Sequence, residues 1–320
     1  MERLDEFMAR ANAAYYANRD PFADFVTSPE ISQIFGELLG AWAVVVWQSM
    51  GSPSPVILAE AGPGRGTLMA DALRLIRRLA PDFAAALSVH LVETSPRLRA
   101  EQRAKLGDVA FHDRLEHLPP GPMILLANEF IDALPIRQFV RREVWMERFV
   151  QDAAFVEQPA EIALPEAEEG SVWEICEPGR EIVAALAGRF RAQNGVALFI
   201  DYGPARSDFG DSFQALRHRE PADPLEAPGE ADLTAHVDFQ ALAEAAIGAD
   251  AHGPVPQGIF LARLGLFQRM GMLTRTQKPR EAMATMAAAR RLAEADGMGQ
   301  LFKVLAICSP GLPEPPGFSE

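Results

Sequence analysis

Residues 56–67, with the sequence VILAEAGPGRGT, constrain the fold of this chain more than any other segment. The segment begins with a short apolar run that lacks helical spacing and ends with three glycines at alternate positions, Gly62, Gly64 and Gly66. Apolar residues then recur at the 3.6-residue spacing of a helix in residues 68–76. The segment predicts a buried strand, a tight turn and a helix, which together form the first unit of an α/β fold.

The glycine turn also predicts a ligand-binding site. Glycine lacks a Cβ atom, so the backbone can approach a ligand closely, and the start of a helix offers unpaired N–H groups. The dinucleotide fingerprint is G-x-G-x-x-G, whereas here the third glycine comes one residue early and Thr67 follows it. A carboxylate at Glu60 would repel a pyrophosphate and attract a cation. The pattern therefore favours S-adenosylmethionine, with its sulfonium and amino groups, over NAD; a turn that serves packing alone is the structural alternative.

Composition and charge exclude several classes of protein. The chain has 320 residues, 48% of them hydrophobic, which suffices for one large domain or for a domain with an insertion. Its net charge of -14 argues against general nucleic-acid binding, because phosphate contacts need excess Lys and Arg. Cys176 and Cys308 are far apart, and the histidines show no H-x-x-x-H pair, so we expect neither a disulfide framework nor a metal site.

The sequence offers no sign of membrane insertion or of a targeting signal. No apolar run is long enough to span a bilayer, and residues 1–19 lack the core of a signal peptide. We therefore expect a reducing, cytoplasm-like compartment. The oligomeric state stays open.

Two further strands are predicted to end in acids that could bind a nucleoside. Residues 87–95 predict a strand that ends at Glu93 and Thr94, and an acid at this place in a doubly wound sheet can accept both ribose hydroxyls. Residues 110–115 predict a short strand and loop in which Asp113 could accept from an adenine amino group. A solvated carboxylate is the alternative interpretation at both positions.

Residues 122–135 predict a buried strand that runs into polar side chains. Asn128 and Glu129 fall at the carboxyl edge of the sheet, where ligands of α/β folds bind, and Asp132 follows closely. The start of a helix would explain Asn128, but it explains the three polar residues together less well. We therefore expect this turn to contribute to the site.

The segment before the glycine strand predicts helices and a loop. Residues 4–16 have a helical apolar face, and Ser28 with Pro29 and Glu30 forms a helix start signal. Capping alone would explain this pattern. The functional interpretation is that the loop, with Asp24, Thr27, Ser28 and Glu30, folds over the cofactor or the substrate.

The rest of the chain completes the predicted sheet and adds an insertion. Alternating residues in 137–159 predict antiparallel strands that could form a wall for the substrate. Residues 196–203 predict a buried strand with polar residues at its exit, 207–232 a long loop, 258–270 and 279–294 helices, and 301–308 a last strand. The expected organisation is an N-terminal helical cap at 1–52, a core at 53–136 and 170–310, a β-rich insertion at 137–169 and a Pro-rich tail at 311–320.

Five motifs, in this order, resemble the MidA family, which includes the mitochondrial complex I assembly-factor methyltransferase. They are residues 24–37 (DFVTSPEISQIFGE), 60–68 (EAGPGRGTL), 128–135 (NEFIDALP), 201–203 (DYG) and 229–239 (GEADLTAHVDF). The resemblance implies a class I methyltransferase fold, with a Rossmann-like, doubly wound, mostly parallel seven-stranded sheet, and S-adenosylmethionine as methyl donor.

The resemblance also implies a substrate and a location. From the mitochondrial member it implies symmetric dimethylation of an arginine in a quinone-side subunit of respiratory complex I, in support of complex assembly. It implies a cytoplasmic location in bacteria and the mitochondrial matrix for eukaryotic relatives.

Candidate residues follow from these patterns together. The expected cofactor-binding residues are Glu60, Gly62, Pro63, Gly64, Gly66, Thr67, Glu93, Thr94, Asp113, Asn128, Thr27 and Ser28. Guanidinium is a poor nucleophile, so carboxylates must hold it bidentately and take its proton. The expected catalytic residues are Glu129, Asn128, Asp132 and Glu30. A small-molecule methyltransferase and a non-catalytic cofactor-binding assembly factor remain open, while Glu60 and the glycine spacing oppose an NAD oxidoreductase.

Overall fold

The central sheet of this computed structural model, which describes residues 1–19, 22 and 26–319, has seven strands. Their order across the sheet is β14 (Asp250–Pro256), β15 (Phe302–Cys308), β10 (Gly195–Tyr202), β5 (Met123–Asn128), β2 (Val56–Ala61), β3 (Leu87–Val92) and β4 (Ala110–His112). Neighbouring strands from β10 to β4 pair in parallel, whereas β15 runs antiparallel to both β10 and β14. The predicted doubly wound, mostly parallel seven-stranded sheet is confirmed.

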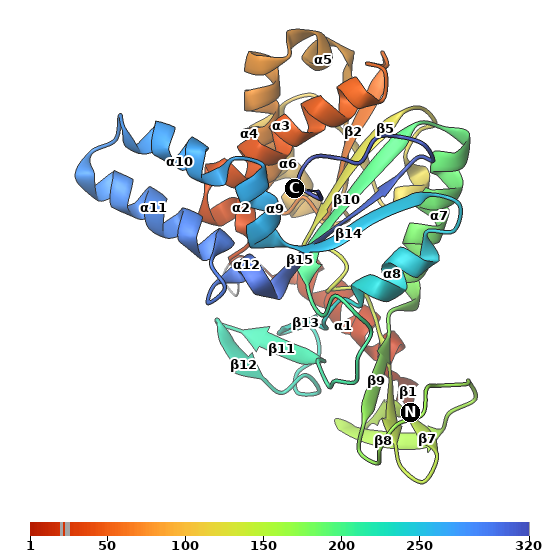
Figure 1. The fold of residues 1–320 in the computed structure, drawn as a ribbon. Coiled ribbons are helices and arrows are strands. Elements are labelled where there is room, and N and C mark those ends of the chain that lie inside the picture. The colour runs from red at the N-terminus through yellow and green to blue at the C-terminus, as the bar shows by residue number, and fades with distance from the viewer. Residues whose placement is uncertain (20–21, 23–25, 320) are drawn as a thin grey trace.

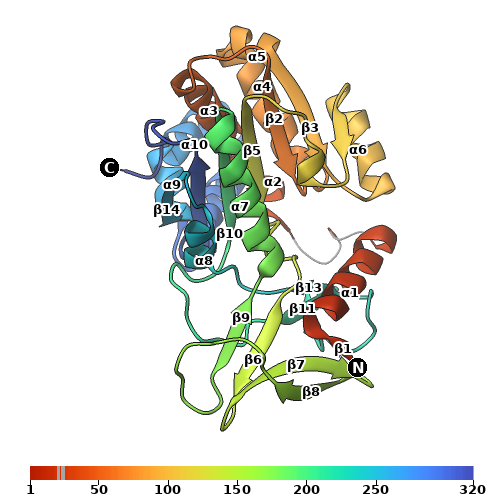
Figure 2. The same cartoon turned by 90° about the vertical axis from the view of Figure 1, so that its right-hand side faces the viewer.

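Helices cover both faces of this sheet (Figures 1 and 2). Successive side chains of a strand point to opposite faces, and in β2 Val56 and Leu58 join one apolar core while Ile57 and Ala59 join the other. The first core packs against α3 (Gln33–Ser49), α4 (Thr67–Leu79), α5 (Pro81–Ala86), α9 (Gln257–Arg263), α10 (Leu266–Thr274) and α11 (Pro279–Ala293). The second packs against α7 (Glu177–Ala192) and α8 (Phe239–Ala245).

A separate antiparallel sheet occupies the predicted insertion. Its order is β1 (Glu2–Arg3), β7 (Trp145–Gln151), β6 (Arg137–Arg141) and β9 (Val172–Ile175), and β8 (Ala154–Pro159) also pairs with β7. The sheet thus continues beyond residue 169 and includes the N-terminal strand. In Figure 2 it lies below the central sheet, beside the N-terminus.

A third apolar core joins the N-terminal helix α1 (Leu4–Asn18) to the smaller sheets. Leu4, Phe7 and Met8 pack with Val150 of the insertion and with Leu233. Leu233 belongs to a three-stranded sheet of β11 (Gln214–Arg217), β12 (Glu220–Ala222) and β13 (Asp232–Thr234). The prediction of a long loop over 207–232 was therefore wrong at residues 214–217, 220–222 and 232, which form strands, and buried side chains such as Ala215 join the segment to the core around α1.

Two other elements differ from prediction. The helix expected at 258–270 is two helices, α9 and α10, because Gly265 adopts a left-handed φ of 94° between them. Strand β14 was not predicted, since Gly253 and Pro254 interrupt its alternation where the pairing with β15 shifts register. The remaining short elements are α2 (Ser28–Ile31), α6 (Pro96–Leu106), a 3-10 turn (Leu115–His117) and α12 (Met298–Leu301). Of the helices described, none has the length and apolar character needed to cross a bilayer.

The contact between α3 and α4 gives a test of the packing. A Cβ atom at Gly40 would lie 2.8 Å from both the Cα and the carbonyl oxygen of Ala72, so Gly40→Ala must push the two helices apart. We expect this substitution to lower the free energy of unfolding by about 1–3 kcal/mol, measured by urea denaturation. Gly271→Ala is the matched control, because this helical position has open space around it and alanine favours a helix by up to about 1 kcal/mol. Equal stability of the two variants would contradict the packing described.

Candidate active site

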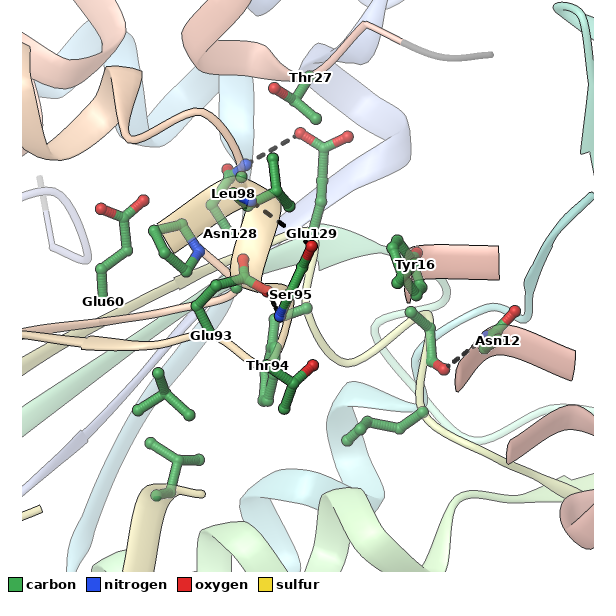
Figure 3. A pocket seen from close by; sticks show the side chains of 18 of the residues that line it. Asn12, Tyr16, Thr27, Glu60, Glu93, Thr94, Ser95, Leu98, Asn128 and Glu129 are labelled. Carbon is green, nitrogen blue, oxygen red and sulfur yellow. Dashed lines mark hydrogen bonds between the residues drawn. The ribbon is translucent and has the colours of Figure 1, made fainter. Parts of the chain in front are cut away.

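A cavity of about 740 Å³ lies where β2, β3 and β5 end, at the carboxyl edge of the parallel strands (Figure 3). Glu60, Glu93 and Glu129 line it from these strand ends, and Asn12 and Tyr16 of α1 line it as well. In the view of Figure 3, Glu60 and Glu93 lie on one side, Asn12 and Tyr16 on the other, and Glu129 between them. The cavity thus has a side made by the glycine turn and a side made by the N-terminal helix.

The glycine turn has the conformation that its sequence requires. Gly62, Gly64 and Gly66 have φ angles of 62°, 53° and 69°, which fall in the left-handed region that favours glycine. Gly62, Pro63, Gly64 and Thr67 line the cavity, whereas Gly66 does not and instead forms the N-cap of α4. A Cβ atom at Gly62 would lie 3.1 Å from the ring of Phe130, so the turn packs tightly on the segment after β5.

Glu60 is a buried carboxyl group with an oxygen that lacks a partner. Its side chain is 3% exposed, and Oε2 accepts no hydrogen bond from the described residues. Burial raises the pKa of the carboxyl to about 8, against the opposing effect of the Met69 backbone N–H in the first turn of α4. A buried carboxylate is costly unless it is paired, so this position suits the binding of a cation.

Glu93 and Asp113 lie at the ends of neighbouring strands but differ in their surroundings. Glu93 Oε1 accepts the backbone N–H of Ser95 at 2.8 Å and Oε2 accepts from Gln102 Nε2 at 3.3 Å, while burial raises the pKa of Glu93. Asp113 accepts from Arg99 Nη2 at 2.7 Å, and its side chain is largely exposed. Both residues line the cavity, as does Thr94.

The turn after β5 carries the other carboxyl of interest. Glu129 has a φ of 51°, which is rare for a residue with a side chain. Its Oε1 accepts the backbone N–H of Ser28 at 3.0 Å and Asn128 Nδ2 at 2.9 Å, whereas no described residue donates to Oε2. Burial raises the pKa of Glu129 to about 7, and the charge of Asp132 adds to this effect. Glu129 is therefore held by one oxygen and can receive a donor on the other.

Three of the predicted site residues do not reach the cavity wall. Besides Gly66, these are Ser28 and Asp132. The N-cap of α2 is Thr27, and Ser28 is its first residue, with a buried side chain whose Oγ lies 3.8 Å from the sulfur of Met298. Thr27 and Glu30 do line the cavity, while Asp24 lies outside the described residues.

Asp132 is buried beneath the turn that carries Glu129. Burial raises its pKa to about 6, and a hydrogen bond from Tyr202 acts in the opposite direction. Its Oδ1 has no hydrogen-bond partner in the part of the chain that the structure describes. Asp132 therefore contributes charge near Glu129 from below the cavity surface.

Sequence reasoning missed the residues that α1 contributes. Asn12 Nδ2 donates to the carbonyl oxygens of Ala133 and Leu233, at 3.0 and 2.8 Å, and Tyr16 donates to Asp232 Oδ1 at 2.7 Å. These partners are 121 to 221 residues away in the sequence. The helical pattern of residues 4–16 predicted an apolar face. It did not indicate which elements would form hydrogen bonds with the polar side chains of the same helix.

The cavity lining is strongly acidic. The arginines that line it are Arg65 and Arg114. The carboxyl groups that line it are Glu30, Glu60, Glu93, Asp113, Glu116, Glu129 and Glu181. This imbalance favours positively charged ligands, and among the described residues no group of His, Cys, Asp and Glu is arranged to hold a metal ion.

Comparisons with known proteins agree with this geometry. A family model described as S-adenosyl-L-methionine-dependent methyltransferase matches residues 38–255. The mitochondrial protein arginine methyltransferase NDUFAF7 homolog of Drosophila melanogaster is 36% identical, over 96% of this chain and 80% of its own length. NDUFAF7 of Homo sapiens is 32% identical, over 96% of this chain and 79% of its own length.

Two solved structures are also similar to this chain over most of its length. A Burkholderia thailandensis protein whose crystal structure holds S-adenosyl-homocysteine superposes with a TM-score of 0.79 at 26% identity. The match covers 98% of this chain and 89% of that protein. A native crystal structure from the same organism superposes with a TM-score of 0.81 at 27% identity.

The buried state of Glu60 gives a second test. The folded chain keeps a proton on Glu60 up to about pH 8, whereas the ordinary pKa of a glutamate is 4.5. We therefore expect the free energy of unfolding to fall as pH rises from 4.5 to about 8, because the folded state binds more protons there than the unfolded state. Glu60→Gln should remove this dependence and weaken S-adenosylmethionine binding roughly 10- to 100-fold, as expected for loss of a charged hydrogen bond.

Urea denaturation between pH 5 and 9 and calorimetric titration with S-adenosylmethionine would measure the two effects. Glu181→Gln is the matched control, because Glu181 lines the same cavity but is exposed. Unchanged affinity in Glu60→Gln would remove Glu60 from cofactor binding.

Proposed function

Because the chain belongs to the MidA family of S-adenosyl-L-methionine-dependent methyltransferases, we propose that it methylates an arginine side chain of a protein substrate. We further propose that the product is a symmetric dimethylarginine in a subunit of respiratory complex I or its bacterial equivalent, and that this modification supports assembly of the complex. The curated relatives named as protein arginine methyltransferases support the substrate class.

The observation that carries the proposal is the state of Glu129. One carboxylate oxygen is fixed by two donors, and the other has no partner among the described residues at the wall of an acidic cavity. A guanidinium group offers several N–H donors in a planar fork, and a carboxylate is the acceptor that matches it. Glu129 Oε2 is therefore suited to receive the substrate arginine.

The same residue can manage the proton that arginine methylation releases. When bound, S-adenosylmethionine supplies an electrophilic methyl group on a positively charged sulfur. The attacking guanidinium nitrogen would form a C–N bond to this methyl group as the S–CH3 bond breaks and its electron pair stays on sulfur, and the nitrogen must lose one proton. Glu129, with its pKa raised to about 7, can hold the guanidinium, concentrate positive charge on the nitrogens that do not react, and accept this proton. Asn128 orients the carboxylate through its hydrogen bond to Oε1.

On the cofactor side, the glycine turn and three acids have separate roles in the proposal. Glu60 faces a cationic group of the cofactor, and Glu93 accepts the ribose hydroxyls. Gly62, Pro63, Gly64 and Thr67 form the adjacent wall, and Asp113 contacts the adenine. Thr27 and Glu30, on the segment before α3, border the place where cofactor and arginine meet.

The first test of this function is the substitution Glu129→Gln. Loss of a positioned catalytic carboxylate should lower the turnover number by roughly 10²- to 10⁴-fold, while S-adenosylmethionine affinity stays near that of the wild type. Transfer of labelled methyl groups to the host's complex I subunits would measure turnover, and calorimetry would measure affinity. Glu116→Gln, in the same cavity, is the control that should keep turnover. Wild-type turnover in Glu129→Gln would exclude Glu129 from the mechanism.

The substrate is tested in the host cell. Mass spectrometry of the complex I subunits from cells with and without this protein should show a dimethylarginine that disappears in the deletion strain and returns with the wild-type gene, but not with Glu129→Gln. Bound cofactor together with no missing methyl group in any protein would instead support the non-catalytic assembly factor. A methyl group missing from a small molecule in the deletion strain would support a small-molecule methyltransferase.

The pH dependence of the reaction follows from the same carboxyl group. Since Glu129 must be ionised to accept a proton and its pKa is about 7, we expect kcat/KM to fall about tenfold per pH unit below pH 7 and to level off above it. Initial rates between pH 5.5 and 9 would measure this profile, with circular dichroism to confirm that the fold persists. A profile that stays flat down to pH 5.5 would show that this ionisation does not control transfer.

A further inference from the structure

Asp201 lies at the end of β10, directly behind the turn that carries Glu129. Its carboxyl is 1% exposed, and Oδ2 accepts three consecutive backbone N–H groups, those of Phe130, Ile131 and Asp132, at 3.2, 3.0 and 3.2 Å. Its Oδ1 accepts the backbone N–H of Tyr202 at 2.9 Å. Successive N–H groups that converge in this way form a concave acceptor site, and here the acceptor is a side chain of the protein itself. Burial, followed by the charges of Asp132 and Glu129, raises the pKa of this carboxyl well above its usual range.

This arrangement explains how Glu129 keeps an unfavourable backbone conformation. A non-glycine residue with a φ of 51° persists only where its surroundings determine it. The backbone N–H of Glu129 donates to the carbonyl oxygen of Ile200 at 2.8 Å. The N–H groups of the next three residues donate to the Asp201 carboxyl. The turn is therefore fixed to β10 at four consecutive amide groups.

The same turn contacts the cofactor side of the cavity. The ring of Phe130 packs on Gly62, where even a Cβ atom would approach it to 3.1 Å. Asp201 therefore fixes a segment that touches the glycine turn at Phe130 and presents a carboxylate to the cavity at Glu129. Asp201 itself does not line the cavity.

We propose that Asp201 is a positioning residue for methyl transfer: its carboxylate binds the backbone of residues 130–132 and thereby sets the direction of the Glu129 side chain. The proposal rests on the role of Glu129 proposed above. It assigns a function to the first residue of the DYG motif, whose side chain does not line the cavity.

The proposal is tested by a double-mutant cycle of Asp201→Asn with Glu129→Gln. Asparagine can keep one oxygen for the three N–H groups but places an amide against the Tyr202 N–H, whereas Asp201→Ala removes every acceptor. We expect kcat to fall at least tenfold in Asp201→Asn and further in Asp201→Ala, with S-adenosylmethionine affinity within about threefold of wild type. In the Glu129→Gln background, Asp201→Asn should change kcat less than twofold, because both residues act through one carboxylate.

Asp238→Asn is the matched control. Asp238 is also a carboxylate that accepts a backbone N–H, that of Ala241 at 3.0 Å, but it caps α8 away from the cavity. This variant should keep wild-type kcat. Losses that multiply in the double variant, or wild-type kcat in Asp201→Asn, would overturn the proposal.

A second measurement separates this proposal from the function on which it rests. Hydrogen exchange of the amides of residues 130–132 should quicken at least tenfold in Asp201→Asn, with no matching change across the central sheet. If Glu129→Gln retains full turnover, the role of Glu129 fails, although faster exchange would still show that Asp201 fixes the turn. If Glu129→Gln is inactive and exchange at 130–132 is unchanged in Asp201→Asn, the positioning role fails alone.

Discussion

The burial of carboxyl groups at one edge of a parallel sheet is the constraint on which the rest of this structure depends. Glu60, Glu93 and Glu129 lie at the ends of three neighbouring strands, and burial raises the pKa of each. Placing such groups away from water costs free energy unless cations or hydrogen-bond donors compensate for it. The sulfonium of S-adenosylmethionine and the guanidinium acceptor proposed above are both cations, and the acidic lining of the cavity favours ligands of that charge sign.

The hydrogen-bond donors to the buried carboxyl groups come from several elements, some of them distant in sequence. The backbone N–H of Ser95 donates to Glu93, and that of Ser28 donates to Glu129. The N–H groups of the turn at 130–132 donate to Asp201. Two carboxyl oxygens without a described donor, Glu60 Oε2 and Glu129 Oε2, belong to residues of the cavity wall, whereas a third, Asp132 Oδ1, lies behind it. The hydrogen bonds inside the protein therefore hold the site rigid, whereas the two oxygens at the wall are open to donors from a ligand.

The N-terminal helix completes a site that the central sheet alone leaves open, and the two smaller sheets pack on that helix. α1 is held by a third apolar core, which includes Phe7 and Leu233, and by the hydrogen bonds of Asn12. The segment 207–232, which the sequence pattern predicted as a loop, supplies β11 and β12 to this arrangement. The short strands of this segment carry few apolar residues. Their buried positions could therefore be identified only from the structure, where they pack in one core with α1.

Local sequence was sufficient to determine the glycine turn and the strand ends at Glu60, Glu93 and Glu129, because glycine spacing and helical periodicity act within a few residues of one another. The mostly parallel sheet was implied by the resemblance to a known family. Tertiary structure alone decided that Asn12 and Tyr16 close the cavity, that Ser28 and Asp132 lie behind its wall, and that Asp201 binds the turn of residues 130–132. These contacts join positions about 70 to more than 200 residues apart, and such pairings arise from the register of β10 against β5 and from the packing of α1, which no local pattern encodes.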